Sequence, residues 1–196
     1  MTVGAVKNTL NEALGALQAL IGNETMLQRI AAAGQLLADT FAAGGRAYAC
    51  GNGGSMCDAT HFAEELTGRF RDNRPGYAAL AISDASHLSC VGNDYGYEQV
   101  FARFIEAHGR AGDVLLAIST SGTSQNVLAA VETAHQRGMK VIGLTGRAAT
   151  PLAESADIAI VTAAGRYADR VQELHIKVIH ILIELVERRL ASANYS

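Results

Sequence analysis

The sequence predicts an α/β protein whose parallel sheet is covered by helices on both faces. Apolar, strand-like segments alternate with amphipathic helical segments over most of the chain, which is typical of parallel strands joined by helical crossovers. The segment DVLLAIS (113–119) is apolar without alternation, as in a strand buried on both faces. Glycine-rich and hydroxyl-rich loops follow two of the strands, where sheets of this kind bind ligands.

Two helices are expected first, because apolar residues recur at helical spacing over 5–22 and 24–43 before Gly44 and Gly45. Short apolar runs then alternate with helical patterns, separated by turn residues such as those of DNRPG. The remaining expected elements, in chain order, are strand 46–50, helix 55–70, strand 77–83, a helical segment ending near 108 after a polar stretch (93–99), strand 113–119, helix 125–137, strand 139–146, strand 156–162 and helix 168–190.

Length and composition indicate a single domain over residues 1–196, with 49% hydrophobic residues in 196. The N-terminal helices (1–43) precede an α/β core (46–190). The final helix is apolar almost all around between Val171 and Val186, and one subunit is expected to cover only part of that surface. The chain is therefore predicted to form an oligomer, to which residues 1–43 contribute.

Charge and patterning exclude several classes of protein. The net charge is −3 and no Lys/Arg cluster occurs, which argues against a nucleic-acid surface. The longest apolar run, 178–186, is about half of the ~20 residues of a membrane span. Cys50, Cys57 and Cys90 form no CxxC pair and no signal-peptide pattern opens the chain, so we expect a reduced, cytoplasmic protein.

The loop STSGTS (119–124) is the first candidate ligand site. Five of its six residues carry a hydroxyl and the sixth is Gly122, directly ahead of a helix, where backbone N–H groups favour anions. It contains no Lys or Arg, so neutral donors are expected to bind a phosphate. The loop GNGGS (51–55) follows the neighbouring strand, but neither dinucleotide nor nucleoside triphosphate motifs fit. A phosphorylated small molecule is the better prediction.

Polar side chains on two helices form the second candidate site. If Ser55 is the N-cap of its helix in an S-x-x-D pattern, His61 and Glu65 share a face and Glu64 points away. In the last helix, Gln172 and His180 project to one broad side, whereas His175 is expected at the helix surface. If the helices meet, these side chains could bind Zn²⁺ or act as a general base and acid, and the residues leave both alternatives open.

Four segments of the chain carry a resemblance to a known family. They are GNGGS…DA.HFAEELTGRF, SCVGNDYGYE, GDVLLAISTSG.S and YADRVQE.HIKVIHILIELVE. Together they resemble the bacterial phosphoheptose isomerases of the sugar isomerase (SIS) domain family. The likeness covers nearly the whole chain. It implies a flavodoxin-like three-layer α/β sandwich in a homotetramer. It also implies conversion of sedoheptulose 7-phosphate to D-glycero-D-manno-heptose 7-phosphate, the first step toward the ADP-heptose of lipopolysaccharide core.

The resemblance also assigns roles to individual residues. The catalytic pair would be Glu65 and His180, and Zn²⁺ would be bound by His61, Glu65, Gln172 and His180. The residues implied to contact the sugar phosphate are Asn52, Gly53, Gly54, Glu65, Asn93, Asp94, Ser119, Thr120, Ser121, Ser124 and Gln172.

Two alternatives remain at this stage. The same fold and GNGGS loop occur in non-catalytic binding proteins of the replication-initiator-associating type, but these tend to lack a histidine at the position of His180 and to have an STRG-like loop, whereas this chain has Ser121. Another phosphosugar isomerase is the third possibility, because hydroxyl-rich pockets accept many polyols.

Overall fold

A computed structural model describes residues 2–195 and contains one five-stranded sheet. All pairs are parallel and the strand order is β2-β1-β3-β4-β5. The strands are β1 (Ala47–Gly51), β2 (Ala79–Ala81), β3 (Val114–Ser119), β4 (Lys140–Thr145) and β5 (Ile158–Val161). The predicted α/β fold class is therefore confirmed.

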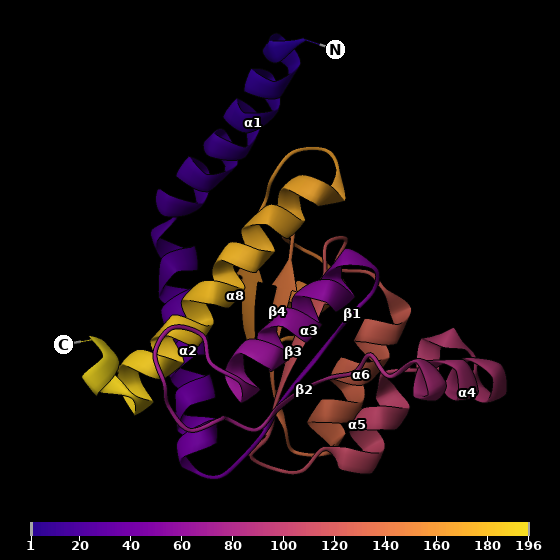
Figure 1. Ribbon diagram of the computed structural model, residues 1–196. Helices are drawn as coiled ribbons and strands as arrows, with labels where there is room; N and C mark the ends of the chain where they lie inside the picture. Colours follow the sequence, from indigo (N-terminus) through magenta and orange to yellow (C-terminus); the bar gives the residue numbers. More distant parts are fainter. Residues whose placement is uncertain (1, 196) are drawn as a thin grey trace.

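Helices cover both faces of the sheet (Figure 1). They are α1 (Val3–Ile21), α2 (Glu24–Ala42), α3 (Gly54–Thr67), α4 (Ala85–Tyr95), α5 (Ala102–His108), α6 (Gln125–Gln136), α7 (Pro151–Ser155) and α8 (Ala168–Leu190), with short 3-10 helices η1 (Tyr97–Gln99) and η2 (Ser192–Tyr195).

Alternate residues of the central strand β3 enter two separate cores. Leu116 and Ile118 pack with apolar residues of α2, α3 and α8, and Leu115 and Ala117 pack with those of α5 and α6. This is what a strand without hydrophobic alternation requires, because both of its faces must be buried. The helices α3 and α8 therefore share one face of the sheet.

The N-terminal helices differ in how they are packed. The helix α2 lies along α8, whereas α1 extends away from the sheet layers (Figure 1). Val6, Leu10 and Leu14 of α1 are exposed although they are apolar.

Three elements differ from the sequence expectation. The helix α4 was not predicted, and Val91 is its one buried residue. Its N-terminus is capped by Asp84, whose Oδ1 accepts from the backbone N–H of His87 at 2.8 Å. The predicted strand 77–83 is reduced to β2 at the edge of the sheet, and the short helix α7 was also missed.

The strand order places the candidate loops together. The chain leaves β1 toward one edge of the sheet and β3 toward the other, so the direction of the connections reverses between these neighbours. Such a switch point leaves a crevice at the carboxyl ends of the strands. Gly51 pairs with Ile118 in register, so the loops 51–55 and 119–124 begin at the same level.

Among residues 2–195, none of the helices combines the length and apolar character that crossing a membrane requires.

Candidate active site

The loop after β1 forms a tight corner into α3. Gly53 is the N-cap residue with φ 55° and ψ −121°, a conformation that L side chains rarely adopt. The helix begins at Gly54, so the expectation that Ser55 is the N-cap is wrong by two residues; Ser55 is buried inside the first turn. At Gly53 an added Cβ would meet nothing within 4 Å, so the backbone of the corner is open to a ligand at this residue.

Asn52 is held by residues that the sequence reasoning did not select. Its amide exchanges two hydrogen bonds with the amide of Asn126, at 2.9 and 2.8 Å. The hydroxyl of Tyr97 donates to Asn52 Oδ1 at 3.3 Å. Asn126 lies in the first turn of α6, directly after the loop 119–124, so this pair ties together the loops of β1 and β3. No motif in the sequence indicated this pairing, since the two residues are 74 positions apart.

The hydroxyl groups of the loop 119–124 converge. Ser119 Oγ lies 2.9 Å from Ser124 Oγ and 3.4 Å from Ser121 Oγ. Ser124 is the N-cap of α6 but its side chain makes no capping bond, so its hydroxyl is directed to the cluster. Gly122 has φ 69°, and a Cβ there would lie 2.3 Å from Thr150 Oγ1. The loop thus has the donor groups that a phosphate needs.

A cavity of about 180 Å³ adjoins this loop and adds positive charge that the loop itself lacks. Thr120 and Ser121 line it together with Arg147 and Arg166. The loop itself has only neutral donors, as expected, but two arginines line the cavity beside it. The sequence could not reveal this, because the two arginines follow β4 and β5.

The helices α3 and α8 meet and bring three of the predicted ligands together. His61 Nε2 lies 2.9 Å from His180 Nε2 and 3.7 Å from Glu65 Oε1. The side chains of His61 and Glu65 are 35% and 19% exposed, so the group is reachable from solvent. A hollow of about 500 Å³ runs along this part of α3 and is lined by Gly53, Met56, Cys57, Thr60, His61, Glu64 and Ser83.

Glu64 belongs to this group, contrary to the expectation that it is only a structural neighbour. Its Oε1 lies 2.9 Å from His61 Nδ1. A carboxylate on Nδ1 fixes the tautomer and orientation of an imidazole whose Nε2 faces a metal or a reactant. The i, i+3 spacing of His61 and Glu64 could have indicated this contact.

Burial and neighbouring charges shift two pKa values toward each other. Burial raises the pKa of Glu65 above its usual value of 4.5, and the Glu64 carboxylate adds to this effect while His61 opposes it. Burial lowers the pKa of His180 below 6.5, and His61 shifts it in the same direction. A carboxylate of raised pKa is a stronger base than a free one, so the pair suits proton transfer.

The other predicted site residues lie elsewhere. The side chain of Gln172 packs over Gly54, where an added Cβ would come within 2.6 Å of its Nε2. This is about two helical turns from the histidine pair. Asn93 and Asp94 end α4, are exposed, and contact each other through a 2.7 Å hydrogen bond. Tyr97, which follows α4, contacts the site through its hydrogen bond to Asn52.

His175 is fully buried, so the expectation of a helix-surface position is wrong. Burial lowers its pKa to about 4, with the backbone of Thr145 partly opposing this. Asp58 of α3 is also buried, which raises its pKa to about 6, and its Oδ2 has no hydrogen-bond partner among the described residues. Neither residue was predicted to act in the site.

The histidine–carboxylate group has the donor types that zinc prefers. Zinc prefers histidine nitrogens and carboxylate oxygens at about 2.0 to 2.2 Å, which puts tetrahedral ligands about 3.3 Å apart. The separations of 2.9 and 3.7 Å around His61 Nε2 bracket that value. His61, Glu64 and Glu65 offer ligand atoms that all lie within 4.8 Å of one another and are the group that could hold the ion, and His180 adjoins this group through His61 Nε2.

Comparison with known proteins agrees with the fold and identifies the class. The SIS domain family matches residues 11–146, and this chain belongs to that family. A phosphoheptose isomerase of Aeromonas salmonicida (strain A449) is 61% identical over 186 residues, which are 95% of this chain and 97% of that protein.

Two solved structures are similar over nearly the whole chain. A phosphoheptose isomerase from Francisella tularensis superposes with a TM-score of 0.90 at 33% identity, covering 96% of this chain and 100% of that one. A phosphoheptose isomerase from Neisseria gonorrhoeae gives 0.85 at 38% identity, covering 94% and 97%. At 96% coverage the similarity continues past residue 146, where the family match ends, into the final helix.

Proposed function

We propose that the protein is a phosphoheptose isomerase that converts sedoheptulose 7-phosphate to D-glycero-D-manno-heptose 7-phosphate. The convergence of Glu65, His61 and His180 carries the proposal, since the identity of 61% to an isomerase extends over the helices that bring them together. A binding protein would not need a base of raised pKa beside two histidines. We expect the product to feed ADP-heptose synthesis for lipopolysaccharide core, in the cytoplasm.

The geometry supports a proton-transfer mechanism through an enediol. Glu65 removes a proton from C1 of the open-chain ketose, and the electrons of that C–H bond form the C1–C2 double bond. His180 relays a proton from the C1 hydroxyl to the C2 oxygen, and Glu65 returns its proton to C2, which completes the aldose. A bound zinc ion would supply Lewis-acid polarisation of the sugar oxygens.

The two parts of the site divide the substrate between them. The hydroxyls of Ser119, Ser121 and Ser124 hold the phosphate at the N-terminal end of α6, beside the start of α3, together with the Thr120 backbone and side chain. Glu65 lies eleven residues after Gly54, about three helical turns further along. Asn52, Gly53, Gly54 and Gln172 line the intervening region, and Asn93 and Asp94 are expected to complete it. One end of a long sugar is thus anchored while the other reacts.

The direct test is turnover of sedoheptulose 7-phosphate by the purified protein, followed as aldose formation. We expect isomerisation, with slower turnover of pentose and hexose phosphates. Binding of the sugar phosphate without turnover would support the non-catalytic alternative instead. Preferred turnover of a shorter sugar phosphate would indicate another phosphosugar isomerase.

Removal of metal tests the zinc proposal separately. We expect a chelator to lower the rate and added Zn²⁺ to restore it, because the group around His61 and Glu65 would lose its ion. The resemblance also implies Gln172 as a ligand, but its side chain lies over Gly54, about two helical turns from the histidine pair. Metal content of the purified protein, measured by atomic emission, provides a readout besides activity. Full turnover with no bound zinc would contradict the proposal.

We also propose that the protein assembles as a homotetramer through its N-terminal helices. Leu10 and Leu14 are 64% and 51% exposed, and with Leu17 and Leu174 they line an apolar groove of about 350 Å³ between α1 and α8. Exposed apolar patches of this kind mark interfaces. A second copy of the chain is the expected occupant.

Charged residues in this groove should break the assembly. The change Leu10→Glu with Leu14→Glu is expected to lower the mass measured by light scattering from four chains to fewer, because two carboxylates would be buried unpaired. Asn8→Glu, on the opposite side of α1, adds a charge without touching the groove and should leave the mass unchanged. A single-chain mass for the unchanged protein would contradict the proposal.

A further inference from the structure

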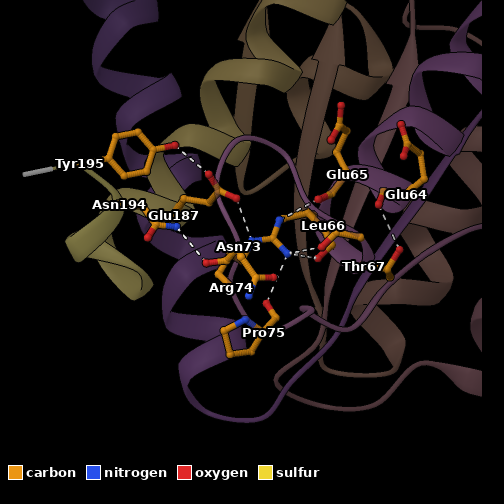
Figure 2. A network of polar contacts seen from close by, with 11 residues as sticks. Glu64, Glu65, Leu66, Thr67, Asn73, Arg74, Pro75, Glu187, Asn194 and Tyr195 are labelled. Atoms are coloured by element: carbon orange, nitrogen blue, oxygen red, sulfur yellow. Dashed lines mark hydrogen bonds and ion pairs between the residues drawn. The ribbon is translucent and has the colours of Figure 1, made fainter.

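A buried ion pair connects the loop after α3 to α8. Arg74 donates from Nε to Glu187 Oε1 at 2.7 Å, and the side chains are 1% and 0% exposed. No other ion pair among the described residues is buried on both sides. Burying two charges is costly unless further hydrogen bonds satisfy them. Figure 2 shows the further hydrogen bonds of Arg74 and Glu187.

The guanidinium of Arg74 caps the C-terminal end of α3 (Figure 2). Its Nη2 donates to the backbone carbonyl of Glu65 at 2.7 Å, and its Nη1 donates to those of Leu66 and Gly68 at 2.8 and 2.9 Å. The last carbonyls of a helix have no partner within the helix and carry partial negative charge. Arg74 therefore provides hydrogen-bond donors for the free carbonyl groups of the last turn of α3, including the carbonyl of Glu65.

The carboxylate of Glu187 is held on its other side. Tyr195 of η2 donates its hydroxyl to Glu187 Oε2 at 2.7 Å. Glu187 lies seven residues after His180 on α8, which is about two helical turns on the same side. One buried network thus links the turn that carries Glu65 to the helix that carries His180.

We propose that Arg74 is a positioning residue that sets the placement of Glu65 relative to His61 and His180. The inference rests on the proposed function of Glu65 and His180. A planar guanidinium can meet the Glu65 carbonyl, the Leu66 carbonyl and Glu187 at the same time, because its donors form a rigid fork. Lysine offers a single ammonium, which cannot reach both helices with the same geometry.

The test compares Arg74→Lys with Arg189→Lys. Arg189 lies on α8 as well and forms an exposed ion pair with Asp39, at 3.1 Å. For Arg74→Lys we expect kcat for sedoheptulose 7-phosphate to fall by about 10- to 100-fold, as a shift of about 1 Å can cause. We expect KM to change less than twofold, since the phosphate loop lies at the other end of α3. Arg189→Lys should match the unchanged protein in both.

A spectroscopic readout separates positioning from a general loss of stability. In ¹⁵N-histidine-labelled protein at one pH, Arg74→Lys should move the imidazole signals of His61 and His180 and leave that of His135 in place. Fully folded Arg74→Lys with unchanged kcat and unchanged imidazole signals would overturn the proposal. So would equal effects in Arg189→Lys.

Two further arms keep the outcome decisive. If Arg74→Lys does not fold, Tyr195→Phe replaces it, because this change removes one outer hydrogen bond of the same network. We expect a smaller change in kcat and in the imidazole signals of His61 and His180. No change in either would overturn the proposal. If the unchanged protein does not turn over the heptose phosphate, the proposed function fails, but the imidazole signals still report whether Arg74 sets the geometry.

Discussion

Glu65→Gln is expected to lower kcat for isomerisation by about 10²- to 10⁴-fold while the sugar phosphate still binds. The amide has nearly the shape of the carboxylate but cannot accept the proton from C1. Glu65 is the carboxylate that lies 3.7 Å from His61 Nε2, beside the histidine pair, and its pKa is raised by burial. The measurement is steady-state aldose formation, with binding followed by calorimetry.

The neighbouring Glu64 provides the matched control. Glu64→Gln removes a carboxylate from the same turn of α3 and from the same histidine, but from its Nδ1 side. We expect a smaller loss, about 10-fold, because an amide can still orient the imidazole. A Glu65→Gln protein that binds the sugar phosphate and keeps full turnover would contradict its role as the base, and so would an equal loss in Glu64→Gln.

The sheet and its ligand-binding edge could be predicted because they depend on local pattern. Strands such as 113–119 show a buried apolar run, and the loops after β1 and β3 carry glycines and hydroxyls that ordinary turns do not require. The helix α4 escaped prediction because it is mostly exposed and buries little besides Val91. The Asp84 cap at its N-terminus is a local signal for the helix besides apolar spacing.

The site was predictable in its residue types but not in its contacts. The spacing of His61 and Glu65 placed them on one face, yet only the packing of α3 against α8 brings His180 to within 2.9 Å. The same packing explains the error at His175, which is buried because α8 is covered by α2, α3 and β4 together. Helical phase fixes which residues share a side, whereas tertiary packing decides which side is covered.

Glu187→Gln is expected to lower the free energy of unfolding by about 3–5 kcal/mol, the usual effect of removing one partner from a buried ion pair. Arg74 would remain 1% exposed with its charge uncompensated. The measurement is urea unfolding at a single protein concentration, because assembly would otherwise shift the midpoint.

Glu184 offers a control on the same helix. Glu184→Gln removes a carboxylate that pairs with Arg71 and Arg188, and its side chain is 25% exposed. Water and salt screen such pairs, so the expected loss is about 0–1 kcal/mol. Equal losses for the two glutamates would contradict the idea that burial makes the Arg74 pair different.

The double change Arg74→Met with Glu187→Leu separates the charge from the shape of this network. With both charges removed, no ion is left buried alone, so the loss of stability should be smaller than the sum of the two single changes. Turnover should nevertheless stay low in the double variant, because the carbonyl of Glu65 has lost its donor. A protein that regains stability without regaining kcat would show that the pair is kept for the placement of Glu65 rather than for stability; recovery of both would contradict the positioning role.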